Sequence, residues 1–147
     1  CSPRGGLPGF VKVVNENCII IPDSKGNNRL DSLVNIIETK QVGCLFMIPG
    51  VDETLRINGR GRISTSAAHL KLFSHHKNLP KTCIEIRIKE VFLHCAKALM
   101  RSKLWSTDAK MERSKFPTIA SMLNDQLCLT EPTESQATMV ARYQQDL

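Results

Sequence analysis

The sequence contains the stretch Gly26-Asn27-Asn28-Arg29-Leu30-Asp31-Ser32-Leu33, in which a glycine turn, two potential helix-capping asparagines and an arginine lie together. Apolar residues recur from there at i, i+3, i+4 and i+7, which predicts an amphipathic helix with a buried stripe of Leu30, Leu33, Val34 and Ile37. Before the turn, residues 18–21 form an apolar run with three isoleucines, closed by a proline. This run predicts a buried strand that leads through the turn into the helix.

A strand that leads through a turn into a helix presents free backbone N–H groups at the first helical turn. The helix dipole favours an anion at that position, and Arg29 can add charge-assisted hydrogen bonds. The segment is therefore a candidate phosphate site. A second interpretation stays open, in which Asn27 or Asn28 only caps the helix, Asp31 offsets the dipole, and Arg29 is solvated.

The remaining pattern predicts a mainly β chain with short helices. The segments expected to be strands are residues 10–14, 18–21, 42–48, 54–63 and 84–93. The first two should form a hairpin, and residues 42–48 should be buried. Gly59 and Gly61 interrupt the fourth segment, which indicates a bulge or a sharp corner. Short strands in one domain favour a closed or partly closed barrel, because closure removes exposed strand edges.

The character of the sequence changes after residue 105. Residues 96–104 predict a short helix, a second helix is expected to begin near Pro117, and a third near Thr133. The Thr133 hydroxyl and Gln136 form a candidate capping box for the third helix. The segment retains too many apolar residues for a disordered tail. We therefore expect one domain at residues 1–105, with residues 106–147 as a helical extension packed on the same domain.

Several motifs follow one another in a fixed order over the first 105 residues. They are Ser2-Pro3-Arg4-Gly5, Pro8-Gly9-Phe10-Val11, Ile21-Pro22-Asp23 with the segment to Arg29, Ile48-Pro49-Gly50 with the segment to Gly59, His94-Cys95-Ala96-Lys97-Ala98, and Arg101-Ser102 with Trp105. In this order they resemble the pyridoxamine phosphate oxidase-like flavoproteins. The similarity is greatest to uncharacterised FMN-dependent members of that family. It implies an FMN-binding split β-barrel whose first strand is missing here, because Cys1 directly precedes the first motif.

The resemblance also implies which residues bind FMN. The residues implied to hold its phosphate are Asn27, Asn28 and Arg29. The residues implied to lie along the flavin and its ribityl chain are Ser2, Arg4 and Asp23. The residues implied to approach the flavin ring, where a cation or donor stabilises the reduced anion, are Thr54 and Arg56. The residues implied to come from the second subunit of a homodimer, with flavin sites at its interface, are Lys97, Arg101 and Trp105.

Two of these assignments have ordinary structural alternatives. Trp105 can be an interface anchor without any contact to a cofactor. Arg4 can pair with a carboxylate. Both alternatives stay open at the level of the sequence.

The implied activity is that of an FMN-dependent oxidoreductase, with hydride transfer through flavin N5 to or from an unidentified small molecule. We expect no catalytic side chain of the nucleophilic kind, because the sequence has no convincing Ser-His-Asp or Cys-His signature. The alternative from another class is a non-catalytic flavin-binding module, such as a carrier or a sensor.

The uneven charge allows a third interpretation, a basic protein that binds nucleic acid, but the aromatic residues do not support it. The formal net charge is +6, and residues 71–115 hold eleven basic against four acidic residues. Such a segment can attract nucleic acid or an anionic cofactor. The single tryptophan stands apart from the other aromatic residues, and no base-stacking or groove-reading motif is present. Nucleic acid is therefore not the expected partner.

The cysteines and the hydropathy indicate the cellular setting. The six cysteines form no C-x-x-C pair, which favours free thiols and a cytoplasmic location. His94 and Cys95 have no second ligand pair at useful spacing, so no metal site is expected. The longest apolar run, residues 42–48, is far shorter than the roughly 20 residues that a membrane helix needs.

Overall fold

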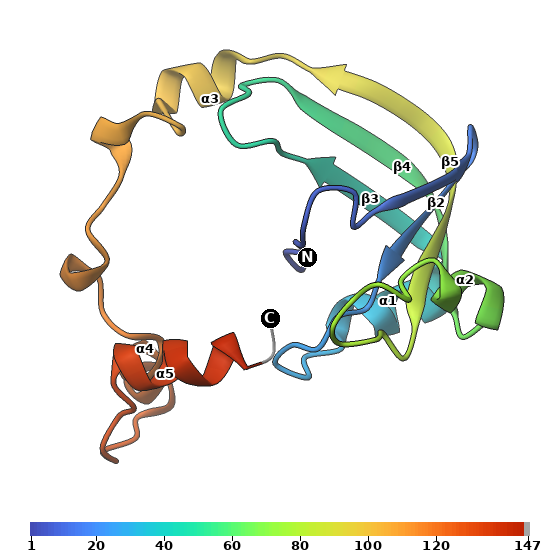
Figure 1. Cartoon of the computed structure of the whole chain (residues 1–147). Coiled ribbons are helices and arrows are strands. Elements are labelled where there is room, and N and C mark those ends of the chain that lie inside the picture. Colours follow the sequence, from blue (N-terminus) through green and yellow to red (C-terminus); the bar gives the residue numbers. More distant parts are fainter. Residues whose placement is uncertain (146–147) are drawn as a thin grey trace.

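The computed structural model describes residues 1–145 and consists of one curved antiparallel sheet with short helices (Figure 1). The sheet has five strands in the order β1-β2-β5-β4-β3. The strands are β1 (Lys12–Asn15), β2 (Cys18–Pro22), β3 (Gln41–Phe46), β4 (Thr54–Ser64) and β5 (Cys83–His94). The prediction of a mainly β fold with short helices is confirmed.

The N-terminal hairpin forms as expected. Strands β1 and β2 pair in antiparallel fashion, and the Asn15 side chain accepts a hydrogen bond from the backbone N–H of Asn17 in the turn, at 2.9 Å. Strand β2 then pairs with β5 along its whole length, from Cys18 opposite Arg87 to Pro22 opposite Cys83. The predicted buried strand at residues 18–21 is correct, because β2 lies inside the sheet and three of its isoleucines are buried.

Strands β4 and β5 form the longest strand pair of the sheet. Its register shifts between Asn58 and Gly59, which confirms the predicted bulge. A Cβ atom on Gly59 would lie 2.3 Å from the carbonyl oxygen of Arg87. The glycine is therefore required because another strand passes at this point.

The two faces of the sheet carry separate cores. The inner face, as we call the face that packs against helix α1 (Asp31–Thr39), holds the main apolar cluster of Ile19, Ile21, Ile36, Ile57, Ile84 and Ile86. On the other face, which we call the outer face, helix α2 (Ala67–Lys71) and the turn after it cover a smaller cluster of Ile20, Phe73 and Cys83. Residues 54, 56 and 58 of β4 alternate with inner-face residues and belong to the outer face.

The start of α1 differs from the sequence prediction. Its N-cap is Leu30, with no side-chain hydrogen bond, so neither Asn27 nor Asn28 caps the helix. The Asn27 carboxamide oxygen instead accepts from the backbone N–H of Arg29 at 3.1 Å, and Asn28 has a φ of +60°. The two asparagines build a turn before the helix, because both side-chain and backbone geometry favour asparagine there.

The predicted buried stripe of α1 is correct only for Leu33, which is partly buried and packs against the main core. The fully buried residue is Ile36, whereas Leu30, Val34 and Ile37 are 54%, 46% and 56% exposed. The reason is the place at which the helix meets the sheet. It lies over the small backbone of Gly61, where an added Cβ would be 3.2 Å from Ile36, and this contact rotates the predicted stripe away from the core.

The expectation of a buried strand at residues 42–48 is correct only in part. Strand β3 ends at Phe46 and lies at the edge of the sheet. Its inner-face residues are half-buried, but Leu45 on the outer face is 57% exposed. Leu45 lines an open groove between β3, β4 and α3 rather than a packed core, which explains the difference.

The C-terminal part is helical, as predicted. It contains α3 (Lys97–Ser102), two 3-10 turns (Thr107–Ala109 and Arg113–Lys115), α4 (Ile119–Leu127) and α5 (Gln136–Gln144). The cap of α5 is Ser135, whose hydroxyl accepts from the backbone N–H of Thr138 at 3.1 Å. The predicted capping box at Thr133 is therefore wrong, because the N-cap lies two residues later, at Ser135.

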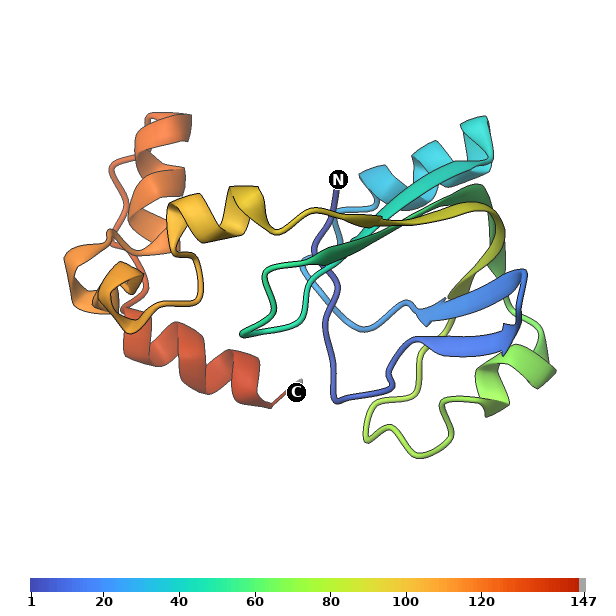
Figure 2. The same ribbon diagram turned by 90° about the horizontal axis from the view of Figure 1, so that it is seen from above.

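Figures 1 and 2 both show α4 and α5 apart from the sheet, and residues of both helices line one small pocket. The prediction that residues 106–147 pack on the same domain stays a prediction, and its last two residues lie outside the described part of the chain. None of the helices within residues 1–145 is long and apolar enough to cross a membrane.

Candidate functional site

The first group of predicted residues gathers at the start of α1, and we call Ser2, Arg4, Asp23, Asn27, Asn28 and Arg29 the entrance cluster. The Ser2 hydroxyl hydrogen-bonds to the Ser32 hydroxyl in the first turn of the helix. Arg4 Nη1 lies 2.9 Å from Asp23 Oδ1, and the Thr82 hydroxyl donates to Asp23 Oδ2 at 3.1 Å. Both carboxylate oxygens of Asp23 thus have a partner in the chain, and Arg4 is paired with a carboxylate.

Arg29 is the most accessible cation of the entrance cluster. Its side chain is 76% exposed, and its Nε donates to Asp31 Oδ2 at 2.6 Å. This hydrogen bond holds the pKa of Asp31 below its ordinary value. The Nη1 and Nη2 groups of Arg29 make no hydrogen bond within the described residues. They are therefore available to an anion.

The donors at the start of α1 fit a phosphate monoester such as that of FMN. The first helical turn has no side-chain cap, so its backbone N–H groups remain available. The Arg29 guanidinium and the Asn28 carboxamide add donors beside them. Asp31 is the single acidic residue of this turn, and its contact with Arg29 leaves the terminal guanidinium nitrogens outward.

A groove of about 510 Å³ crosses the far end of the outer face. Thr54 and Arg56 both line it, and the Arg56 guanidinium lies 5.0 Å from the centre of the Phe92 ring opposite it on β5. The complete lining is Gly43, Cys44, Leu45, Met47, Thr54, Arg56, Asn58, His94, Cys95, Ala98 and Leu99. Mostly apolar walls with a few polar groups are typical of ligand sites.

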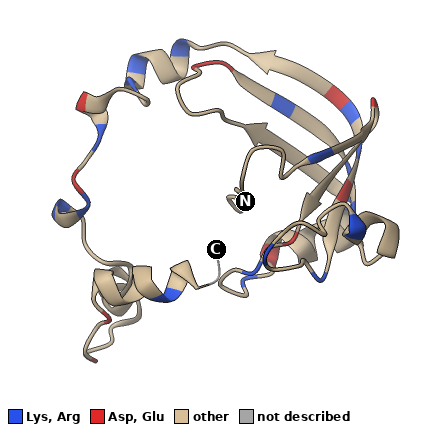
Figure 3. Ribbon diagram, in the orientation of Figure 1, with Lys and Arg blue, Asp and Glu red and all other residues tan. Residues whose placement is uncertain are grey.

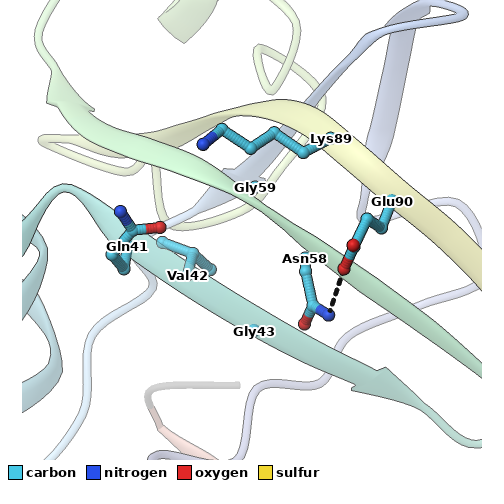
Figure 4. A pocket seen from close by; sticks show the side chains of 7 residues that line it. All are labelled: Gln41, Val42, Gly43, Asn58, Gly59, Lys89 and Glu90. Carbon is cyan, nitrogen blue, oxygen red and sulfur yellow. Dashed lines mark hydrogen bonds between the residues drawn. The ribbon is translucent and has the colours of Figure 1, made fainter.

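A second depression, of about 400 Å³, continues this groove along the sheet (Figure 4). The two share Gly43 and Asn58, and we call them together the outer groove. Figure 4 shows Asn58 of β4 turned toward Glu90 of β5, and its Nδ2 donates to Glu90 Oε2 at 3.0 Å. The outer groove therefore changes from polar at the bulge to apolar beside α3.

The third predicted group lies on α3 and just after it. The Trp105 indole N–H donates to the backbone carbonyl of Val51 at 2.9 Å, which fixes this segment to the β3–β4 loop of its own chain. Ala98 and Leu99 form one wall of the outer groove. Lys97 and Arg101 are exposed and make no hydrogen bond or ion pair within residues 1–145. Both are therefore free to reach another molecule.

Within one chain, the entrance cluster does not lie beside Thr54 and Arg56. Arg4 lies close enough to Cys44 to affect its thiol: burial raises the pKa of Cys44, and the charge of Arg4 opposes that rise. Arg56 alternates with Leu55 and Ile57, which pack in the inner core. The entrance cluster thus lies on the opposite face of the sheet from Thr54 and Arg56, the residues predicted to approach the flavin ring.

The outer groove also contains residues that the sequence analysis did not assign to a site. His94 lies opposite Thr54 in the β4–β5 register, and it lines the groove with Cys95. Only the pairing of the two strands brings this histidine beside Thr54. No spacing along the sequence could have indicated it.

A separate buried group on the outer face resembles a catalytic triad in composition but not in geometry. The Ser64 hydroxyl lies 2.9 Å from His69 Nδ1, and Glu85 Oε2 lies 3.7 Å from the same nitrogen. In a triad, the serine and the carboxylate contact opposite nitrogens of the ring. Arg62 donates to Glu85 from Nε and Nη2, at 2.8 and 2.6 Å. This group is therefore structural.

We expect Glu85→Gln to lower stability at neutral pH by about 1–2 kcal/mol. Burial alone would raise the pKa of Glu85, but the Arg62 hydrogen bonds and the nearby positive charges outweigh it and hold the pKa below its ordinary value. A carboxyl with a depressed pKa in the folded state stabilises the fold above its unfolded pKa, and this stabilisation is lost as pH falls through the folded pKa.

Urea unfolding between pH 3 and pH 7 measures this effect. The difference between wild type and Glu85→Gln should be largest at pH 7 and should shrink toward pH 3. Glu90→Gln, at an exposed position of the same strand, should show no such difference. A difference in unfolding free energy between wild type and Glu85→Gln that stays constant with pH would contradict the stabilising role of the Glu85 carboxylate.

A family model described as Pyridoxamine 5'-phosphate oxidase matches residues 2–95, a span that includes the entrance cluster and the three strands that line the outer groove, β3, β4 and β5. No curated protein matches the sequence. Two similar solved structures are the 1.70 Å crystal structure of HupZ from Group A Streptococcus and the 1.98 Å structure of its histidine-to-alanine variant.

Both structures are 16% identical to this chain in sequence. The first has a TM-score of 0.48 and covers 57% of this chain and 68% of that chain. The second has a TM-score of 0.49 and covers 58% of this chain and 73% of that chain.

Proposed function

Because this chain belongs to the pyridoxamine 5'-phosphate oxidase family, we propose that it is an FMN-dependent oxidoreductase that works as a homodimer. The observation that carries the proposal is the entrance cluster, where uncapped helical N–H groups and an exposed arginine fit a phosphate. The family match covers this cluster and the groove strands together. Family membership by itself supports a flavin-binding, oxidoreductase type of fold.

The entrance cluster would hold the phosphate end of the cofactor. Arg29 would donate from its two terminal nitrogens, and the Asn28 carboxamide and the backbone N–H groups of the first helical turn would complete the set. Asn27 positions Arg29 through its hydrogen bond to the Arg29 backbone. Ser2 is tied to this turn through Ser32, and Arg4 is held by Asp23.

The outer groove would bind the flavin ring of FMN. The chemistry that FMN supplies when bound is hydride exchange at N5 with a small molecule. Thr54 would orient the ring, and the fixed charge of Arg56 would stabilise negative charge on the reduced ring. The apolar walls of the groove would help to exclude water from this contact. The substrate is a small molecule of a class that these residues do not specify.

The separation of the two clusters supports a homodimer. Within one chain they lie on opposite faces of the sheet, so a single cofactor needs residues from two chains to contact both. A two-fold axis makes every such contact twice and yields two equivalent sites. Lys97 and Arg101 would then be supplied across the interface. Trp105 would fix the α3 segment from which both cations project.

Titration of the purified protein with FMN and with riboflavin tests the proposal. We expect FMN fluorescence to be quenched on binding and the complex to be yellow, with riboflavin bound more weakly because it lacks the phosphate. Equal affinity for the two ligands, or no binding of either, would contradict the phosphate assignment.

Anaerobic reduction separates the oxidoreductase from a non-catalytic flavin carrier or sensor. The oxidoreductase should be bleached by a nicotinamide or deazaflavin donor and should regain its colour with an acceptor in repeated cycles. A carrier or sensor would bind FMN without such turnover. The cytoplasmic location stays a prediction.

A further inference from the structure

The C-terminal helices lack the apolar contacts that short helices need. Helices α4 and α5 have nine residues each, and isolated helices of that length are marginal in water. Met139 is the one residue of the pair that is buried. Leu123 and Leu127 on α4 remain 48% and 61% exposed. The α4–α5 pair therefore requires another surface.

Helix α1 has apolar side chains on its outward side that are not covered within the described residues. Its outward side carries Leu30, Val34 and Ile37 at i, i+4 and i+7, all about half exposed. Single exposed apolar residues are ordinary, but three in line on a nine-residue helix form a patch. We call these three residues the α1 stripe. It begins at the entrance cluster, where the proposed flavin phosphate is bound.

The charge distribution is compatible with a missing surface that belongs to a second copy of the chain. Residues 1–115 hold 19 basic and 10 acidic residues, whereas residues 116–147 hold one basic and four acidic residues. Figure 3 shows basic residues along β5 and α3 and few on the α4–α5 pair. Two strongly basic sheet domains repel each other, and an acidic segment that crosses between them offsets this repulsion.

Chain direction supports the same arrangement. The Trp105 contact with Val51 fixes the start of the segment, and both views show the chain leaving its own sheet after α3, with α4 and α5 apart from the sheet and α5 running back in its direction. If α3 closes the flavin site of the partner, the following helices reach the region beside the partner's entrance cluster. The α1 stripe lies in that region.

We propose that the α4–α5 pair of each subunit packs on the α1 stripe of the other subunit. This inference rests on the homodimer of the proposed function. The helical extension then packs on the barrel domain of the partner and covers the helix that begins at the phosphate site. Each chain supplies one α4–α5 pair and one α1 stripe, so a dimer covers the exposed apolar residues of both.

Photo-crosslinking between isotopically distinct subunits tests the proposal. One full-length chain carries p-benzoylphenylalanine in place of Ile37 at natural isotope abundance, and wild-type chain labelled with ¹⁵N is mixed with it until subunits exchange. After irradiation, mass spectrometry of the tryptic peptides identifies which chain supplied each crosslinked partner. We expect crosslinks to peptides within residues 119–144 of the ¹⁵N chain.

Two results would overturn the inference. One is crosslinks to residues 119–144 that join only unlabelled peptides, with none to the ¹⁵N chain after confirmed exchange. The other is no crosslink to this segment in a sample that sedimentation shows to be dimeric. FMN titration of the wild type is read separately. Crosslinks in trans without FMN binding would contradict the flavin function alone, and a flavin-binding dimer without them would contradict the docking alone.

A matched pair of substitutions gives a second readout. Ile37→Glu places a charge on the α1 stripe, and Asn35→Glu places the same charge at an exposed polar position of the same helix. We expect Ile37→Glu to raise the dimer dissociation constant about tenfold or more. Asn35→Glu should leave it within about twofold. Circular dichroism checks that both variants are folded, and equal effects of the two would contradict the docking.

Discussion

The Gly59→Ala variant is expected to lose about 3 kcal/mol or more of unfolding free energy. The added methyl carbon would lie 2.3 Å from the backbone oxygen of Arg87 and 3.0 Å from a methyl group of Ile86. A backbone oxygen in a paired strand cannot move aside as a flexible side chain can. The β4–β5 pair must therefore open at the bulge, and it carries residues of the outer groove on both strands.

Gly43→Ala is the matched control for this prediction. Gly43 lies on neighbouring β3, and a Cβ atom there would lie 3.4 Å from the end of the Asn58 side chain. We expect urea unfolding to show Gly43→Ala within about 1 kcal/mol of wild type. Similar midpoints for the two variants would show that the close approach at Gly59 is not a constraint.

Arg29→Ala is expected to weaken FMN binding by about 1.5–3 kcal/mol, which corresponds to roughly 10- to 150-fold in dissociation constant. The side chain is exposed and, within residues 1–145, is bonded only to Asp31, so its removal should leave the fold intact. It would remove charge-assisted hydrogen bonds to the phosphate. Riboflavin lacks that phosphate and should bind wild type and variant equally.

Fluorescence quenching with both ligands measures the effect. Arg60→Ala removes the same charge from an exposed position on β4 and controls for the general field of the protein. It should change FMN affinity little. If Arg29→Ala weakens riboflavin as much as FMN, Arg29 has a structural role and the phosphate assignment fails.

The strands were largely predictable from the sequence because a strand has a short local period. Alternation identified β5, and the glycines of β4 located the bulge at Asn58 and Gly59. Helix α1 was predictable in existence but not in orientation. Its apolar residues cover more than one face, and only the close approach over Gly61 decides that Ile36 is buried while Val34 and Ile37 are not.

The candidate site was likewise predictable from the sequence only in part. Local sequence located the turn, the helix start and Arg29, which are neighbours along the chain. His94 enters the outer groove only through its pairing with Thr54, a contact across forty residues that no local pattern encodes. The surface that covers α4 and α5 depends on tertiary or quaternary packing, which is equally beyond local patterns. The assignment of FMN came from the resemblance rather than from residue chemistry.

Mixing of Arg29→Ala with Arg101→Ala subunits tests most directly the claim that each flavin site is built from two chains. FMN is held at a concentration where neither variant binds it alone, and mass spectrometry with one ¹⁵N-labelled variant confirms exchange. In a mixed dimer, both substitutions fall in one site and the other site is intact. Statistical mixing should therefore restore about one quarter of the wild-type FMN sites. No recovery despite confirmed exchange would contradict the shared site and place all FMN ligands within one chain.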